Sequence, residues 1–319
     1  DEAQYGGQEG GEDLEGAGVV LAVGHSARDL VEGLHRRGQV AVAFQPFSVG
    51  LRAEHPQAMV DEAQYGGRWA PLAGHGRKLP TADYRLVASG LDTAGLGGSE
   101  PSAAYSFCMC PGGQVVPTAL TPHELCVNGM SFSRRQSAFA NSGVVVPVKE
   151  EDVAPFVSSA ADLPLAGLLF QRHAEREAAR LGGGGLVAPV QSVPDFLEGK
   201  APSAGSAAPP SSYRLGVRPA PLHGLYPPQV TEALRQGLAA FGRDLPGYDS
   251  ARGVLHGVET RTSSPVRVLR DPGTMESPTV PGLFPAGEGA GYAGGIVSAA
   301  VDGGRAARAV LRSLRLEAA

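Results

Sequence analysis

The sequence predicts an α/β fold in which a β-rich α+β domain is inserted into a second, open α/β domain. Three observations support this prediction. A strand–turn–helix pattern occupies residues 18–38 near one end of the chain, and a strand, a glycine-rich loop and a helix occupy residues 282–314 near the other. Between them lie short, mainly β segments and then two helices.

The first α/β unit lies within residues 18–38. Residues 19–23 form a continuous apolar run, which is typical of a buried parallel strand. Ser26 opens a capping-box pattern, so we expect a helix to begin there and to end at Gly38. Residues 1–17 are a polar lead-in whose first seven residues, DEAQYGG, recur at 61–67. One repeated heptapeptide is no repeat architecture, and we assign it no function.

The middle of the chain reads as the inserted domain. Residues 39–60 alternate in a half-exposed strand pattern, and the chain stays mainly β as far as about 150. We expect the inserted domain to span 46–271, and 18–45 and 272–319 to form the interrupted domain. Within the insert we expect two helices, a flexible low-complexity segment and a returning strand, over residues 164–181, 228–241, 198–216 and 254–271.

The C-terminal unit carries the strongest functional signal. A long glycine loop before a helix presents bare N–H groups, and the helix start adds partial positive charge, so an electron-rich ligand fits there. Glu288 follows the strand directly, where an acid suits a sugar hydroxyl. A tight turn without a ligand is the alternative. The loop glycines are Gly287, Gly289, Gly291, Gly294 and Gly295, and we expect the helix face that packs on a sheet to contain Ile296, Ala300, Gly303, Ala307, Val310 and Leu314.

Composition narrows the classes of function. The net charge is -5, only 18% of residues are charged, and no basic stripe is present, so nucleic acid is not an expected partner. No apolar run reaches the ~18 to 20 residues that span a bilayer. The three cysteines cannot form a disulfide framework, so we expect a reducing, intracellular compartment. The acidic start has the pattern of neither a secretory signal nor a transit peptide.

Three further patterns could carry chemistry. Ser26 suggests a nucleophile elbow and a serine hydrolase, but Arg28 stands where that motif needs glycine. Cys108 and Cys110 form a C-x-C pair that would share one strand face, either for redox work or as two small apolar side chains. We predict no metal site. Arg261 and Arg267 lie in a hydroxyl-rich segment that reads either as a solvated strand edge or as a polar wall for an anionic substrate or a flavin edge.

Several blocks taken together resemble a poorly characterised family of FAD-dependent dehydrogenases from bacteria and plastid-bearing eukaryotes. The blocks are residues 20–29, 46–57, 105–113, 127–135, 259–267 and 282–295. The resemblance implies a Rossmann-like FAD/NAD(P)-binding domain of the glutathione-reductase type, interrupted by a substrate domain, in a plastid stroma or a bacterial cytoplasm. It places Gly287, Glu288, Gly289, Gly291, Gly294, Gly295 and Ile296 along the flavin, and Gly24 and His25 near the nucleotide half.

The chain departs from that family in one respect. It has no N-terminal G-x-G-x-x-G unit, on which the AMP half of FAD would lie, so we expect an incomplete FAD-binding domain. Either the sequence is truncated or the protein has lost the unit and holds FAD weakly. We therefore expect a flavin-dependent oxidoreductase that exchanges a hydride with a small, anionic substrate bound by Arg261, Arg267 or Arg134. The alternative is a cofactor-free binding module. The electron donor and acceptor are not readable from the sequence.

Overall fold

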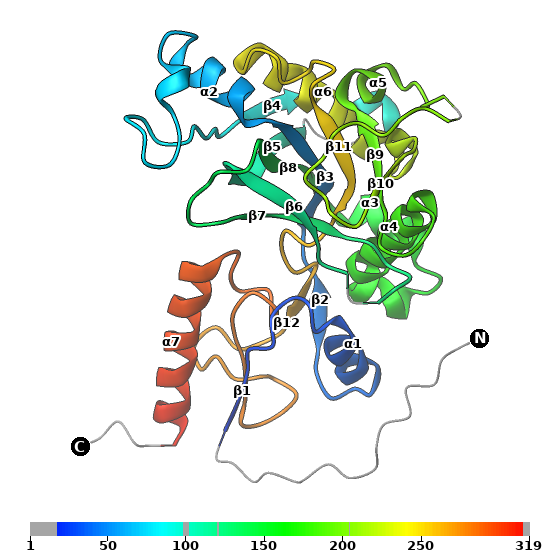
Figure 1. The fold of residues 1–319 in the computed structure, drawn as a ribbon. Helices are drawn as coiled ribbons and strands as arrows, with labels where there is room; N and C mark the ends of the chain where they lie inside the picture. The colour runs from blue at the N-terminus through cyan, green and yellow to red at the C-terminus, as the bar shows by residue number, and fades with distance from the viewer. Residues whose placement is uncertain (1–17, 98–101, 120, 204, 315–319) are drawn as a thin grey trace.

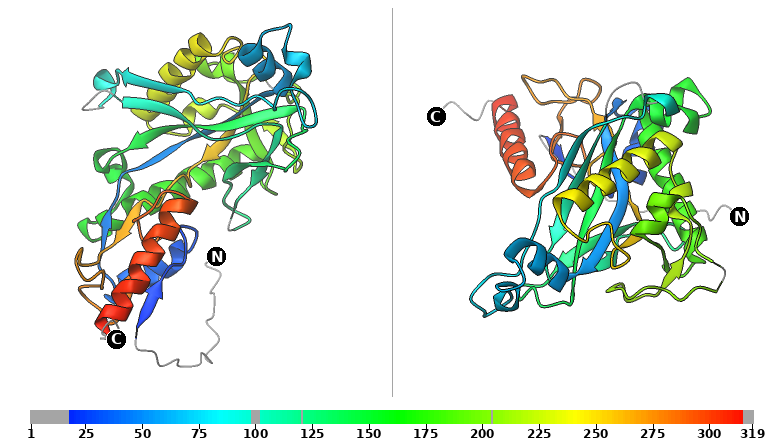
Figure 2. Two further views of the ribbon diagram at one scale, coloured as in Figure 1. Left: turned by 90° about the vertical axis from the view of Figure 1, so that its left-hand side faces the viewer. Right: turned by 90° about the horizontal axis from the view of Figure 1, so that it is seen from above.

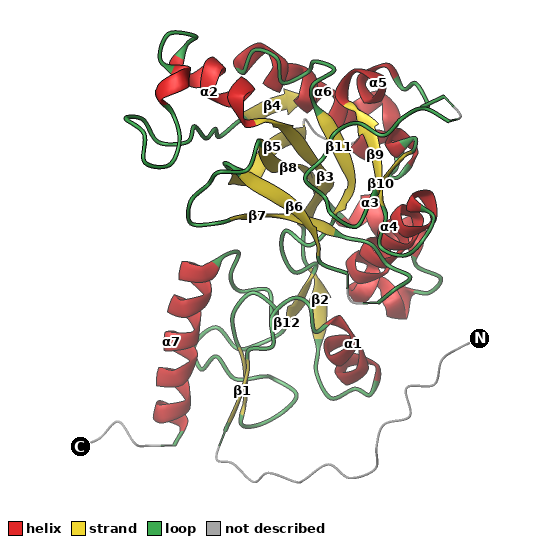
Figure 3. Ribbon diagram, in the orientation of Figure 1, coloured by secondary structure: helices red, strands yellow, loops and turns green. Residues whose placement is uncertain are grey.

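The computed structural model describes residues 18–97, 102–119, 121–203 and 205–314, and within them it is a mixed α/β protein (Figures 1 and 3). The strands are β1 (Val19–Leu21), β2 (Val42–Phe44), β3 (Phe47–Pro56), β4 (Val87–Leu91), β5 (Ser102–Cys110), β6 (Gly113–Pro117), β7 (Val127–Ser131), β8 (Phe139–Val148), β9 (Ala188–Ser192), β10 (Val217–Pro219), β11 (Val254–Glu259), β12 (Val266–Val268) and β13 (Leu283–Pro285). The α-helices are α1 (Arg28–Arg36), α2 (Gln57–Tyr65), α3 (Glu150–Val153), α4 (Ala166–Gly182), α5 (Val193–Glu198), α6 (Pro228–Asp244) and α7 (Ile296–Ser313).

A seven-stranded sheet forms the larger part of the molecule. Its strand order is β10-β9-β11-β3-β8-β5-β4, with β9 and β10 parallel and all other neighbours antiparallel. Helix α6 packs on β4, β5 and β8, helix α4 packs on β9 to β11, and the β6–β7 ribbon lies against β3, β5, β8 and β11. Because β3 is central, almost all of it is buried. The half-exposed strand expected in this region was therefore wrong.

The remaining elements gather at the opposite end of the molecule (Figure 2, left). Strands β1 and β13 pair in parallel, and β2 pairs with β12 in antiparallel fashion. Helix α1 packs its buried Val31 into a cluster with Val42, Val266 and α4's Leu168. Helix α7 buries Ala306 and Ala309 against β13. The sheets and helices of the two ends thus share an apolar contact through α4.

Several expectations for the inserted segment can be compared with these elements. Helices α4 and α6 confirm the two predicted helices, with a left-handed Gly183 ending α4 and Pro228 opening α6. Helix α2 was missed, and it contains most of the second DEAQYGG copy; the first copy lies outside the described residues. The low-complexity segment has no helix or strand in its described residues after Gly199. Its end is nevertheless anchored, because the Tyr213 hydroxyl donates to the Leu186 carbonyl over 2.6 Å.

Two predictions at the ends of the chain were wrong. Helix α1 begins at Arg28 with no side-chain cap, and Ser26 is exposed in the preceding loop. The predicted packing face of α7 is also displaced, because Asp302, Ala306 and Ala309 are the buried residues whereas Ile296 is 91% exposed. The side chain of Asp302 has polar partners beneath the helix, and these select a different face from the one that apolarity alone predicts.

Strand β1 is parallel as predicted but is not buried. Val19 is 57% exposed and Val20 is 42% exposed, since β13 is the only described strand that pairs with β1. Val297 and Val301, near the start of α7, are likewise exposed. No helix within the described part of the chain is long and apolar enough to cross a bilayer.

Candidate functional site

The two glycine loops singled out in the sequence meet at the ends of β1 and β13. Because these strands are parallel neighbours, the loops that follow them leave the same edge of the ladder. A Cβ added to Gly289 would lie 2.3 Å from the Gly24 carbonyl oxygen and 2.8 Å from the Gly24 Cα. Only glycine at position 289 therefore allows the two main chains to touch.

An ion pair joins the same two loops. The His25 Nδ1 lies 3.0 Å from the Glu288 Oε1, and both side chains are about one-quarter exposed. Glu288 also accepts, through its main-chain carbonyl, the N–H of Gly291 over 3.0 Å, so its loop folds back on itself. The pair leaves a carboxylate and an imidazole at the surface of the junction, where either could bind a polar ligand.

Asp302 of α7 holds the first turn of the glycine loop. Its Oδ2 accepts the N–H of Gly287 over 2.8 Å, and both of its oxygens accept from Arg270 over 2.7 and 3.0 Å. Burial acts to raise the pKa of Asp302, but the Arg270 hydrogen bond and the Gly287 N–H outweigh it and lower that pKa. Gly287 has a φ of 76°, in the left-handed region that favours glycine. The turn is thus fixed before any ligand binds.

A second contact steadies the middle of the loop. The Arg270 guanidinium carbon lies 3.5 Å from the centroid of the Tyr292 ring, a stacked cation–π arrangement. The Tyr292 hydroxyl donates to the Val268 carbonyl of β12 over 3.0 Å. A Cβ added to Gly291 would lie 2.6 Å from the Val266 carbonyl oxygen, so this glycine too packs directly on main chain.

The last two glycines of the loop behave differently, because they face open space. Apart from the flanking residues, no atom in the described part of the chain lies within 4 Å of where a Cβ at Gly294 or Gly295 would stand. Helix α7 begins at the next residue, Ile296, without a side-chain cap. Among the described residues, the N–H groups of Ile296, Val297 and Ser298 have no hydrogen-bond acceptor. Open glycines beside free N–H groups of an 18-residue helix suit an electron-rich ligand.

The C-x-C pair lies at the end of β5, but not in the way predicted. A register shift between Phe107 and Cys110 breaks the pairing with β8, and Cys108 has a φ of 43°. The thiols therefore do not stand on one face of a regular strand. Burial is the main cause that raises the pKa of both thiols, and for Cys108 the Glu288 carboxylate adds to it.

A buried arginine supports this irregular strand end. Arg52 of β3 is fully buried and makes two 2.7 Å bonds with Glu259 of β11. It also donates to the Cys108 carbonyl over 3.0 Å and to the Asn128 Oδ1 over 2.7 Å. A Cβ on Gly129 would lie 2.8 Å from the Arg52 Nη1, so that glycine is required too. Arg52 fixes the position of the main chain that carries Cys108.

The structure separates the two predicted anion-binding arginines. Arg261 is buried, and its guanidinium is bound by Glu175 over 3.0 and 2.7 Å and by the Thr118 carbonyl over 2.6 Å. These partners occupy the hydrogen-bonding edge that a substrate would need. Arg267 is exposed, and its Nε donates to Gln45 over 2.8 Å beside the Tyr292 ring. Only Arg267 is open to a ligand near the glycine loop.

Sequence reasoning missed the polar residues beneath the site. Arg52 lies between the apolar residues Leu51 and Ala53 of β3, and a charge at such a position is the signal that could have revealed a buried ion pair. Asp302 and Arg270 carried a weaker signal, because acids and arginines are ordinary on surface helices and loops. Ser26 is exposed, and no hydrogen bond among the described residues joins it to a histidine.

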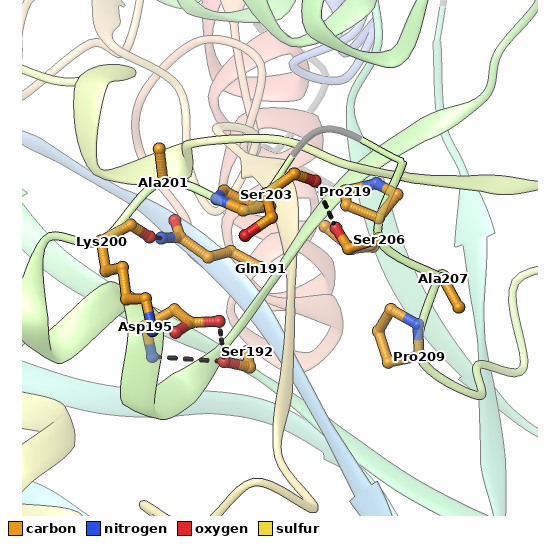
Figure 4. A pocket seen from close by; sticks show the side chains of 12 residues that line it. Gln191, Ser192, Asp195, Lys200, Ala201, Ser203, Ser206, Ala207, Pro209 and Pro219 are labelled. Carbon is orange, nitrogen blue, oxygen red and sulfur yellow. Dashed lines mark hydrogen bonds between the residues drawn. The ribbon is translucent and has the colours of Figure 1, made fainter.

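A separate hollow lies in the sheet part of the molecule, beside α5 (Figure 4). Its volume is about 240 Å³, and Ser192, Asp195 and Lys200 contribute to its wall. The Ser192 hydroxyl donates to the Asp195 carboxylate over 2.8 Å and caps α5 by accepting the Asp195 N–H, while the Lys200 carbonyl accepts from Gln191. These contacts stabilise the start and end of α5, so the hollow has a structural explanation.

Comparison with known proteins identifies the family of the chain. A family model described as "FAD-dependent protein, C-terminal domain-like" matches residues 46–262. The chain belongs to this family. An uncharacterized protein of Clostridium beijerinckii is 42% identical over 310 residues, which make up 96% of this chain and 54% of that protein. The chain therefore spans about half the length of the curated relative that it matches.

Proposed function

We propose that this chain is the catalytic portion of an FAD-dependent oxidoreductase that exchanges a hydride between the flavin and a small substrate. The observation that carries the proposal is the open face at Gly294 and Gly295, directly before the uncapped start of α7. The family match agrees with a flavin rather than another electron-rich ligand. When bound, the flavin supplies the hydride chemistry, and the protein binds, orients and tunes it.

The residues of the glycine loop fit such a group. Gly294 and Gly295 let a planar ring approach the main chain, since a side chain at either position would occupy the open space. The free N–H groups at the start of α7 suit the polar edge of the ring, and Glu288 suits a hydroxyl of its sugar chain. Exposed Ile296 and Val297 would cover an apolar face of the cofactor.

The start of α7 would tune the cofactor rather than create its reactivity. A helix N-terminus stabilises a nearby negative charge by at most ~2 kcal/mol. For a two-electron couple, ~1.4 kcal/mol corresponds to ~30 mV. The helix therefore shifts the potential by tens of millivolts, in the direction that favours an anionic reduced flavin. The selectivity of the reaction would then have to come mainly from how the protein positions the substrate.

Further polypeptide is proposed to complete a Rossmann-like FAD domain on β1 and α7. Parallel strands occur almost always with both faces covered, whereas Val19, Val20 and Val297 are largely exposed. The curated relative is nearly twice as long as this chain, so it contains further residues that could cover these exposed side chains. This further polypeptide would supply the binding surface for the ADP half of FAD.

Titration of FAD tests the proposal. The protein at the full length of its relative should bind FAD, show flavin absorbance near ~450 nm and gain thermal stability, because a ligand of the native state raises its stability. Replacing Gly294 and Gly295 by valine should weaken FAD binding at least about tenfold without unfolding the protein. The matched control replaces Gly67 and Gly95, two other glycines with open surroundings, and should bind FAD normally. Absence of flavin uptake at full length would overturn the proposal.

A further inference from the structure

A cleft of about 490 Å³ opens between two loops of the sheet part, away from the α7 helix start. One wall is the loop that follows α2, with Gly74, Arg77 and Lys78; this loop lies at the upper left of Figure 1 in cyan. The other wall is the loop between β7 and β8, with Arg134 and Arg135. Pockets for small molecules typically occupy ~300 to 1,000 Å³, so the cleft has the size of a ligand site.

The charged side chains that line the cleft are all cationic. Arg77, Lys78, Arg134 and Arg135 all line it, His75 lies among them, and no aspartate or glutamate does. All five of these residues are exposed, and none of them takes part in an ion pair among the described residues. The chain as a whole has a net charge of -5, so this concentration is not a general excess of cations. Uncompensated like charges repel one another, and a bound anion would remove that cost.

Hydrogen bonds hold both loops in place. Gly74 donates its N–H to the Leu79 carbonyl, and Leu79 donates to the Leu72 carbonyl, each over 2.9 Å. The Thr81 hydroxyl donates to the Arg135 carbonyl over 3.2 Å and ties the two walls together. The cations are therefore presented from a fixed main chain, which lowers the entropy cost of binding a ligand between them.

Arg135 adds a conformational observation. Its φ is 47°, in the left-handed region, where residues other than glycine are strained at a cost in free energy. The turn is forced by packing, because a Cβ on Gly112 would lie 2.0 Å from the Arg135 carbonyl oxygen. Glycine at 135 would avoid the cost, yet the chain carries a guanidinium there. Residues held in such conformations concentrate at functional sites.

The cleft adjoins the end of β5 that faces the glycine loop. The main chain of Gly112, two residues after Cys110, contacts that of Arg135: a Cβ on Gly112 would lie 2.0 Å from the Arg135 carbonyl oxygen, and the Ser137 N–H donates to the Gly112 carbonyl over 3.1 Å. In agreement with this contact, the charge of Arg135 acts on the pKa of Cys110 against the effect of burial. A ligand anchored on the cations would thus lie next to the end of β5.

We propose that this cleft binds a small multivalent anion, a phosphoryl or polycarboxylate group, and that it anchors the charged end of the substrate. Guanidinium groups match both of these oxygen-rich groups through paired hydrogen bonds. The binding of the anion stands on the cleft alone. Its assignment to the substrate rests on the proposed oxidoreductase function.

Calorimetric titration of the protein, without added flavin, with pyrophosphate and separately with citrate tests the binding. We expect saturable binding of at least one of them at low ionic strength, weakening as salt is added because the site is exposed. Pyrophosphate alone would indicate a phosphorylated ligand, and citrate alone a polycarboxylate. Replacing Lys78 and Arg134 by glutamine should weaken the binding about tenfold, since each exposed pair contributes modestly. Neither side chain has a hydrogen bond among the described residues, so folding should be preserved.

The control carries the same change of charge elsewhere. Replacing Arg180 of α4 and Arg243 of α6 by glutamine removes two exposed cations outside the cleft and should leave anion binding unchanged. The inference would be overturned if neither pyrophosphate nor citrate binds, or if the control variant weakens binding equally. Retention of the protein on a polyanionic polymer without any response to the two small anions would overturn it as well. If the protein takes up FAD but binds neither anion, only the inference of an anion site is refuted. If it binds an anion but takes up no FAD, the flavin function is refuted and the anion site in the cleft stands.

Discussion

Arg28 and Glu175 form an ion pair, with 2.8 Å between Nη2 and Oε2, that joins the first residue of α1 to the middle of α4. Both side chains are buried, and Arg261 binds the same carboxylate over 2.7 Å. Burial acts to raise the pKa of Glu175, but the two arginines outweigh it and lower that pKa. Arg28 also pairs with Glu124 over 3.4 Å. The Glu175 carboxylate is thus shared by two buried guanidinium groups and couples the glycine-loop end of the molecule to the sheet.

Replacing Glu175 by glutamine should destabilise the protein by about 3–5 kcal/mol, because it leaves the buried Arg261 without its ion-pair partner and Arg28 with only Glu124, at 3.4 Å. Replacing Arg28 by glutamine should cost clearly less, since Arg261 still pairs with Glu175. Urea unfolding followed by circular dichroism measures both values. Equal losses in the two variants would show that Arg261 does not share the carboxylate as the structure has it.

Gly289→Ala should destabilise the protein by about 1–3 kcal/mol or more, the usual cost of inserting a methyl group into a filled space. The clash is with main chain of Gly24, which has no rotamer to adjust. Gly294→Ala is the matched comparison, because it meets no atom within 4 Å, and it should leave the melting temperature of the cofactor-free protein unchanged. A Gly289→Ala protein as stable as the wild type would contradict the contact between the loops.

Acid should weaken the fold through His55. Burial lowers the pKa of this histidine to about 4 from an unfolded value of 6.5, although the Tyr248 carbonyl, 2.7 Å from its Nε2, acts in the opposite direction. The unfolded chain therefore takes up the proton first as the pH falls. The stability that the neutral ring contributes is present above about pH 6.5, is lost between 6.5 and 4, and amounts to about 3 kcal/mol.

His55→Gln checks this assignment. Glutamine can still donate to the Tyr248 carbonyl but takes up no proton, so the free energy of unfolding should depend less steeply on pH between 4 and 6.5. His256, whose pKa burial also lowers, should leave part of the slope in place. Unfolding by urea at a series of pH values measures the difference, and an unchanged slope in His55→Gln would refute the role of His55.

The thiols should react slowly and unequally. Burial raises the pKa of Cys108, which is nevertheless exposed, so at pH 7 iodoacetamide should alkylate it more slowly than free cysteine. Cys126 is buried and should be modified only after denaturation. Peptide mass spectrometry after timed alkylation separates the two sites, with Cys108→Ser as the control. Fast labelling of Cys108 at neutral pH would instead indicate a thiolate.

The sequence predicted those parts of the fold that depend on local pattern. The periodicity of residues 164–181 and 228–241 was sufficient for α4 and α6, because apolar spacing and end residues agree there. Helix α2 was missed because its residues 57–65 carry no strong apolar face. The two glycine loops that the sequence singles out contact one another in the structure, whereas their role as a ligand site stays a prediction.

The prediction failed where long-range polar contacts decide the structure. The packing face of α7 was assigned from apolar spacing, whereas Asp302 and its pairing with Arg270 set the observed face. Arg261 was taken for a ligand-binding group, yet its partner Glu175 is 86 residues away in the chain. No local pattern reveals such pairs. The flavin and the reaction stay proposals, because the residues that would hold the cofactor differ little from those of any tight main-chain junction.

The contact of Gly289 with Gly24 also constrains how this protein can change over generations. Two segments separated by most of the polypeptide share a space too small for a single methyl group. A larger residue at position 289 would have to be matched by a simultaneous shift of the main chain at Gly24. Lineages that acquire new specificity are therefore expected to diversify the cationic loops first and to inherit Gly289 unaltered.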